Sequence, residues 1–178
     1  MRKISLLTWG EAALVAGAVM LGNALTACSS DDATVATSAN DSIAAVADSA
    51  KTVVKDFFVK GYEAHDYDFV MGCVAEDYVD HSPAAARSNA DAVGILKIVE
   101  GQFADLKLTI LDLFAEGDMV ATRIRFEGTH VGTCQGFEPT GRRISFEALE
   151  NFRVANGKIV ESWGYWPDDD IRHQLTAH

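Results

Sequence analysis

Four side chains lie where acid–base chemistry could use them: His81, His130, Glu150 and Asp168. A general acid or base must lie within hydrogen-bond reach of the proton that it transfers. An apolar pocket raises the pKa of a carboxylate toward the working pH, because burial disfavours its charged form. The sequence shows no phosphate-binding glycine loop, no serine nucleophile elbow and no His/Cys metal cluster. These residues therefore give no sign of a bound metal or of a phosphate-bearing cofactor.

Glu150 is an acidic residue on an otherwise apolar strand face. Counting by twos, that face holds Phe146, Ala148, Glu150, Phe152 and Val154. A buried carboxylate is costly unless it is paired, so it marks either a functional site or a buried ion pair. Arg123 and Arg125 are expected on the opposite face of their own strand, which makes them poor partners.

Each of the other three candidates has a second interpretation. His81 follows a strand end and could face a pocket, or it could bond to the loop backbone. His130 shares a strand face with apolar side chains and could line a pocket or be a satisfied core histidine. Asp168 follows Pro167 and could turn inward as an acid, or cap the last helix.

Aromatic side chains are the candidates for the wall of a ligand site. Trp163 and Tyr165 share one face of a strand with Glu161, and Tyr78 precedes His81 in a short extended segment. We expect Tyr78, Trp163 and Tyr165 to contact a ligand. Aromatics at such spacing are also typical of a core.

The order of the expected elements indicates an α+β fold. Helices are expected over residues 49–64, 69–75 and 89–102, with a short extended piece at 77–80. Strands follow from residue 106, then over 119–130, 144–154 and 158–166, and a short helix after Pro167 ends the chain. Asn156-Gly157 is a strong hairpin signal. Helices followed by a run of antiparallel strands define this class.

The first residues predict export and lipidation. Arg2 and Lys3 precede a short apolar stretch over residues 12–21, as in a secretory signal. The sequence Leu25-Thr26-Ala27-Cys28 resembles the lipobox of bacterial lipoproteins, which implies a lipid anchor on Cys28. The alternative is an ordinary cleaved signal with a chance cysteine. Lack of Asp after Cys28 favours the outer membrane if the organism is Gram-negative.

Three segments follow from this interpretation. We expect a signal peptide at 1–27, a flexible tether at 28–47 with few large apolar residues, and one globular domain at 48–178. The formal net charge is −11, and removal of the signal makes it one unit more negative. Nucleic acid is therefore not an expected partner. Cys73 and Cys134 could form a disulfide or remain two buried thiols.

The domain resembles the SnoaL-like polyketide cyclase family of the nuclear transport factor 2 fold superfamily. The resemblance runs from about Tyr62 to Leu175 and rests on the order of several short motifs. These are Tyr78-Val79-Asp80-His81, Glu116-Gly117-Asp118, Gly128-Thr129-His130-Val131-Gly132, Pro139-Thr140-Gly141, Phe152-Arg153-Val154 and Gly157-Lys158-Ile159-Val160-Glu161-Ser162-Trp163.

This resemblance implies a cone-shaped antiparallel sheet around N-terminal helices, with a pocket for a small hydrophobic molecule and a homodimer through the outer sheet face. It also implies an intramolecular aldol reaction without a cofactor, catalysed by an Asp four residues after a Trp. Here that position is Pro167, and Asp168 lies one residue later. We expect a cyclase or isomerase type of acid–base enzyme. The alternatives are a non-catalytic ligand-binding lipoprotein and a protein-interaction domain of the cell envelope.

Overall fold

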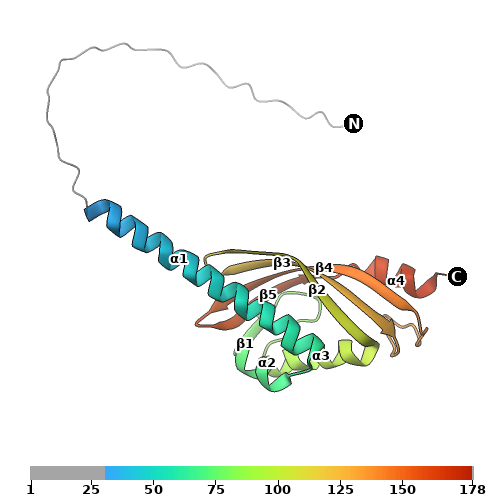
Figure 1. The fold of residues 1–178 in the computed structure, drawn as a ribbon. Helices are drawn as coiled ribbons and strands as arrows, with labels where there is room; N and C mark the ends of the chain where they lie inside the picture. Colours follow the sequence, from blue (N-terminus) through green and yellow to red (C-terminus); the bar gives the residue numbers. More distant parts are fainter. Residues whose placement is uncertain (1–30, 178) are drawn as a thin grey trace, which may run out of the picture.

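A curved, open sheet with helices packed on one face makes up the body of the molecule (Figure 1). The computed structural model describes residues 31–177. The expected signal peptide at 1–27 and the expected lipidation site Cys28 lie outside the described residues.

The sheet has five strands in the order β1-β5-β4-β3-β2. Their bounds are β1 Val74–Asp80, β2 Phe103–Glu116, β3 Met119–His130, β4 Arg143–Ala155 and β5 Lys158–Tyr165. Pairing is antiparallel from β2 to β5, and β1 adds to the edge parallel to β5. The predicted α+β class is confirmed. The parallel edge strand was not foreseen, because its partner β5 lies far away in the sequence.

Helical segments lie before, between and after the strands in the chain. They are α1 (Asp31–Asp56), a π-helix η1 (Phe57–Glu63), α2 (Tyr67–Cys73), α3 (Asn89–Gln102) and α4 (Asp168–Thr176). Side-chain caps begin two of them. The Asp66 carboxylate accepts from the Phe69 N–H at 3.0 Å, and the Ser88 hydroxyl accepts from the Asp91 N–H at 3.1 Å. Such caps satisfy donors that the first turn of a helix leaves free.

The expected flexible tether is instead helical from Asp31 onward, and the prediction of a coil there is wrong. The segment is rich in Ala, which has the highest helix propensity, and it runs into the amphipathic turns that pack on the core. Its helical form does not depend on burial. Ile43 and Val46 remain exposed, and Figure 1 shows this part of α1 projecting from the body.

The core lies between the inner face of the sheet and the helices. Alternate residues of β3 and β4 point inward, and rings from both strands and η1 meet there. Phe58 lies 5.6 Å from Phe152, and Tyr62 lies 5.6 Å from Phe126, both edge to face. Each fully buried aromatic or aliphatic side chain contributes about 1.5–3 kcal/mol. Cys73 and Cys134 are both buried free thiols, which settles the open question of a disulfide between them in this structure.

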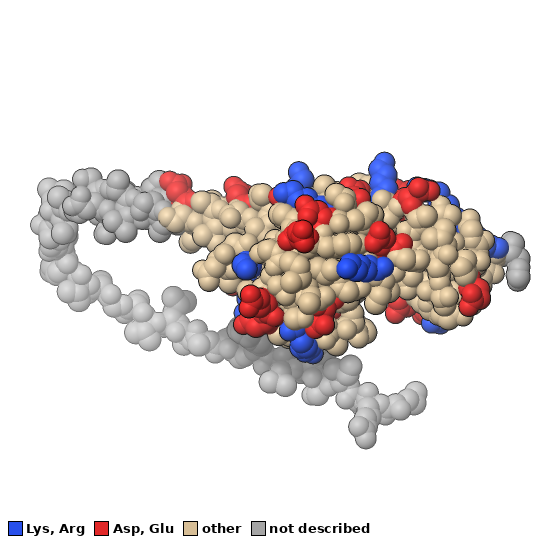
Figure 2. All heavy atoms as spheres, turned by 90° about the horizontal axis from the view of Figure 1, so that it is seen from below, with Lys and Arg blue, Asp and Glu red and all other residues tan. Residues whose placement is uncertain are grey.

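The surface carries charges of both signs. Figure 2 shows acidic and basic side chains interspersed over one face of the body. From Asp31 to Ala50 the sequence of α1 contains acidic residues but no Lys or Arg. Of the helices within residues 31–177, none combines the length and the apolar character needed to cross a membrane.

Candidate active site

A cavity of about 400 Å³ opens between the inner face of the sheet and helix α3. Apolar side chains from α3, β4 and η1 form its walls, among them Leu96, Val99, Phe152 and Phe57. Residues from β1, β4 and β5 supply the polar groups. The arrangement follows from the alternation of the strands, since every second residue of β4 and the inward residues of β5 must face the helices.

Glu150 lies on the inner face of β4 and points into this cavity. Its side chain is almost fully enclosed, with the residue 8% exposed. The Trp166 indole Nε1–H donates to Glu150 Oε1 at 3.0 Å. Burial raises the pKa of Glu150 to about 7, the Trp166 hydrogen bond opposes this rise, and the charge of Asp80 adds to it. A carboxyl group with this pKa can both accept and return a proton near neutral pH.

Gly164 keeps the space beside the Glu150 side chain open. The two residues are direct partners across β4 and β5. A Cβ atom on residue 164 would lie 3.6 Å from Glu150 Cγ and 3.7 Å from Ser82 Cβ. Any larger side chain here would fill the part of the cavity next to the carboxylate.

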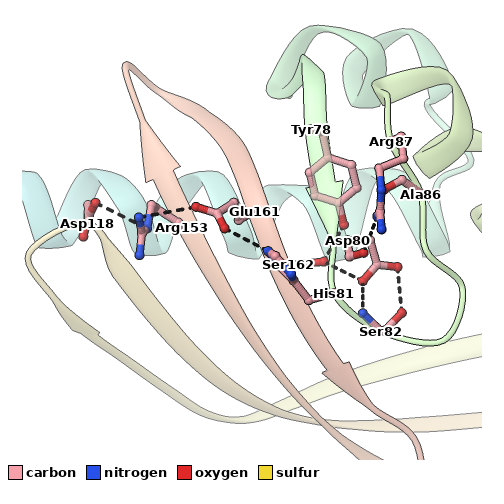
Figure 3. Close-up of polar contacts among 10 residues, drawn as sticks. All are labelled: Tyr78, Asp80, His81, Ser82, Ala86, Arg87, Asp118, Arg153, Glu161 and Ser162. Carbon is pink, nitrogen blue, oxygen red and sulfur yellow. Dashed lines mark hydrogen bonds and ion pairs between the residues drawn. The ribbon is translucent and has the colours of Figure 1, made fainter.

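A chain of hydrogen bonds forms the second polar group of the cavity (Figure 3). The Tyr78 hydroxyl is bonded to Ser162 Oγ at 2.5 Å, and Ser162 Oγ donates to Asp80 Oδ1 at 3.3 Å. Asp80 also accepts from the Ser82 N–H at 2.8 Å and from the Ser82 hydroxyl at 2.7 Å. The Asp80 carboxylate thus accepts three hydrogen bonds, two from Ser82 and one from Ser162, which fix its orientation at the edge of the cavity.

The two buried phenols of the cavity stay protonated. Burial raises the pKa of Tyr62 well above its ordinary value, and the charge of Glu150 adds to this effect. Burial also raises the pKa of Tyr78, against the hydrogen bond with Ser162. Both tyrosines therefore present neutral, polar hydroxyls beside the carboxylates.

The expected site residues separate into three places. Glu150 and Tyr78 line the cavity, as expected. Tyr165 and Asp168 lie at its rim, where Tyr165 is 69% exposed and Asp168 Oδ1 accepts from Gln135 Nε2 at 3.0 Å. Asp168 is the first residue of α4, with Pro167 at the cap position, so it borders the mouth of the cavity and does not cap the helix.

His81 and Trp163 lie outside the cavity, contrary to our expectation. The two rings are stacked with their centroids 4.7 Å apart, and His81 Nε2 lies 2.8 Å from Glu161 Oε2. Figure 3 shows His81 joined to Glu161 and onward to Arg153 and Asp118. The reason is the direction of β5, whose Ser162 faces inward and whose Trp163 therefore faces outward.

His130 is a core histidine and does not meet Glu150. It lies eight residues along β3 from Thr122, the residue paired with Glu150. Its Nδ1 accepts from the Thr140 N–H at 3.2 Å, and its ring packs near Phe103. Within residues 31–177, its Nε2 is the one buried side-chain nitrogen or oxygen that has no hydrogen-bond partner. The expected meeting of His130 and Glu150 in one cavity is therefore wrong: His130 lies at the end of β3, and Glu150 lies on β4 opposite Thr122.

Sequence reasoning missed four members of the site: Tyr62, Asp80, Ser162 and Trp166. Asp80 lies two residues after Tyr78 on β1 and therefore on the same face of the strand. Counting by twos along β1 would have predicted that Asp80 also faces inward. Ser162 and Trp166 were hidden by a register shift in the pairing of β5 with β4, beyond Arg153. Such a bulge exchanges the two faces of a strand and leaves no clear mark in the sequence.

Comparisons with known proteins match nearly the whole described domain. The sequence model of the family described as SnoaL-like polyketide cyclase matches residues 52–175. The chain is similar to DauD, an aklanonic acid methyl ester cyclase of Streptomyces sp. (strain C5), with 26% identity over 62% of this chain and 71% of the relative. DnrD, a cyclase of the same name from Streptomyces peucetius, also has 26% identity, over 62% of this chain and 79% of its own. The solved structure of TsrD from Streptomyces laurentii covers 73% of this chain and 96% of its own, with 26% identity and a TM-score of 0.67.

Proposed function

Because the chain belongs to the SnoaL-like polyketide cyclase family, we propose that Glu150 is the acid–base group of a cofactor-free reaction on a small, largely apolar molecule. The observation that carries the proposal is a buried carboxylate in an open cavity, with its pKa raised to about 7. The reaction type is that of an aldol cyclase or an isomerase, in which an activated C–H bond loses its proton.

The chemistry needs only groups that the chain supplies. Ionised Glu150 accepts the proton of an acidic C–H bond, and the electron pair of that bond becomes an enolate. In a cyclase the enolate carbon attacks a carbonyl carbon of the same molecule, and the resulting alkoxide takes the proton back from Glu150. In an isomerase the proton returns to a different carbon. The Trp166 N–H orients the carboxylate, and the apolar walls exclude water.

Asp168 has a weaker claim to this role. Its carboxylate is exposed at the rim and is bonded to Gln135. An exposed carboxylate is a poor base at neutral pH because water stabilises its charged form. We therefore assign to Glu150, on β4, the acid–base role that the family pattern gives to an Asp after the last strand.

The proposal is tested with 5-nitrobenzisoxazole, an apolar compound whose ring opens to a coloured phenolate when a base removes its C–H proton. We expect the purified protein to catalyse this ring opening, with a rate that rises as pH increases through about 7, the pKa of Glu150. Glu150→Gln should lower the rate at pH 8 by at least about 100-fold, in line with the usual contribution of a general base.

Glu147→Gln is the matched control, because Glu147 lies on the same strand but on the outer face, bonded to Arg123 and Arg125. It should leave the rate unchanged. Equal rates for wild type and Glu150→Gln would contradict the proposal. Binding of the probe without ring opening would favour the non-catalytic alternative, a ligand-binding protein.

We also propose that the protein acts as an exported lipoprotein anchored through Cys28. The support is the sequence Leu25-Thr26-Ala27-Cys28 after a basic and apolar start. Several acyl chains on one residue give stable anchoring, since each buried methylene contributes about 0.8 kcal/mol. The described domain would then act at the surface of a membrane, the outer one if the organism is Gram-negative.

A further inference from the structure

All charged side chains that line the cavity are acidic. They are Asp80 on β1, Glu150 on β4 and Asp168 at the start of α4. The cavity-facing residues of α3 are apolar apart from Gln102, and η1 contributes Phe57 and the neutral Tyr62. Among the described residues, no Lys, Arg or His belongs to the lining.

The groups bonded to Asp80 and Glu150 do not neutralise the negative charge of the cavity. Arg87 lies near Asp80, but its guanidinium donates to the backbone carbonyls of Asp80 and Ala86, at 2.6 and 2.7 Å. Asp80 accepts three hydrogen bonds, all from the neutral residues Ser82 and Ser162. Glu150 has an indole N–H as its partner instead of a cation. A carboxylate or phosphate ligand would therefore meet like charge in a site of low dielectric.

A metal ion does not fit this arrangement. Within residues 31–177 the His, Cys, Asp and Glu side chains nowhere form a group of three that could hold a metal. The acidic groups are spread along the cavity, between apolar and aromatic surfaces. An organic cation suits such a distribution, because it needs one counter-charge and a large apolar contact area.

Aromatic rings supply the remaining part of a cation site. The rings of Tyr62, Tyr78 and Trp166 line the same cavity as Glu150. The face of an aromatic ring attracts a cation, and the attraction is larger where water is excluded. The combination of a buried carboxylate with ring faces is suited to an ammonium group on an apolar body.

We infer that the ligand of this cavity is an organic amine, with one protonated nitrogen beside Glu150 and an apolar ring system against α3. The inference rests on the proposed function in taking this cavity as the substrate site. It narrows the substrate class from small apolar molecules in general to those that carry a single positive charge.

The test compares three compounds with the same naphthylethyl body and different end groups by isothermal calorimetry at pH 8: 2-(2-naphthyl)ethylamine, 2-(2-naphthyl)ethanol and 3-(2-naphthyl)propanoate. We expect the amine to bind at least 10-fold more tightly than the alcohol, and the acid to bind most weakly. The amine should lose affinity at pH 5.5, because Glu150 then becomes protonated while the amine stays charged. Asp80 and Asp168 also face the cavity, and Tyr62 and Tyr78 stay neutral over this range.

Two variants test whether Glu150 is the source of the preference for the amine. Glu150→Gln should weaken binding of the amine and bring the affinities for amine and alcohol to within about 3-fold of each other. Glu147→Gln on the outer face should leave all three affinities unchanged. Near-UV circular dichroism checks that each variant is folded.

Equal binding of amine and alcohol to the wild type, tighter binding of the acid, or no binding of the amine would each overturn the inference. The outcome is separable from that of the proposed function, because 5-nitrobenzisoxazole is neutral. Ring opening that depends on Glu150, without a preference for the amine, would leave the acid–base role standing and remove only the ligand class.

Discussion

Glu150 places an ionisable group in a part of the inner sheet face that is otherwise lined by aromatic and aliphatic side chains. Two neighbouring groups act on the pKa of Glu150 in opposite directions. The hydrogen bond from the Trp166 N–H lowers it, and the charge of Asp80 raises it. Burial dominates the result and raises the pKa of Glu150 to about 7. A carboxyl group with a raised pKa destabilises the folded state wherever it must be ionised, which is a cost that a purely structural residue would not carry.

Glu150→Gln should make the protein more stable at high pH and little changed at low pH. Below about pH 4.5 the carboxyl group is protonated in both the folded and the unfolded state, so it has no effect. As the pH rises from about 4.5 to about 7, the wild type loses up to roughly 3 kcal/mol of stability, because the unfolded state releases the proton more easily, and the loss stays constant at higher pH. Urea unfolding at pH 4.5 and pH 8.5 measures the difference. A variant less stable than wild type at pH 8.5 would show that Glu150 has a cation partner.

At the scale of elements, the end of α3 and the segment after β3 are in very close contact. The Val131 and Gly132 N–H groups both donate to the Gln102 carbonyl, at 2.9 and 3.2 Å. A Cβ atom on residue 132 would lie 2.1 Å from the Gly101 carbonyl oxygen. A glycine at 132 is therefore required for the contact that holds α3, one wall of the cavity, against the bent end of the sheet.

Gly132→Ala should destabilise the protein by roughly 1–3 kcal/mol or more, as expected when backbone has to move to relieve overpacking. Gly94→Ala is the matched control within α3, where an added Cβ meets nothing within 4 Å. That change should stabilise by up to about 1 kcal/mol, since Ala favours the helix over Gly. Thermal and urea unfolding measure both variants. If Gly132→Ala and Gly94→Ala both stabilised the protein or both destabilised it, the contact between α3 and the end of β3 would not be tight.

At the scale of the whole molecule, α1 links the cavity-bearing body to the region of the expected anchor. It begins at Asp31, three residues after Cys28, and its first half projects from the body (Figure 1). An α-helix rises about 1.5 Å per residue, so such an element acts as a stiff spacer where a coil would not. The homodimer expected through the outer sheet face stays a prediction. Exposed Phe114 and Leu149 lie on strands of that sheet.

Lipidation should depend on Cys28 alone among the three cysteines. When the full chain is expressed in a bacterium supplied with labelled palmitate, we expect label in the protein and its recovery with membranes. Cys28→Ala should abolish both, while Ser29→Ala, the neighbouring control, should keep them. Cys73 and Cys134 are buried in the domain and should not take the label. Equal labelling of Cys28→Ala and wild type would disprove the anchor.

The sequence alone was sufficient for helix α3, for strands β3 and β4 with the hairpin that follows them, and for the inward position of Glu150. Helix α3 and strand β3 begin and end where the apolar pattern predicted, and Asn156 and Gly157 both have positive φ in the expected hairpin turn. These features depend on neighbours in the chain, so local patterns record them. Glu150 was found by strict alternation, which holds because β4 has no register shift against β3.

Only the tertiary structure decided which polar groups meet. His81 and Trp163 turned outward, and Ser162 and Trp166 inward, because β5 carries a register shift and pairs with the parallel strand β1. His130 and Glu150 share the inner face of the sheet, yet they lie far apart along it. Each of these outcomes is set by contacts between residues distant in the chain, and a count along the sequence cannot register such contacts.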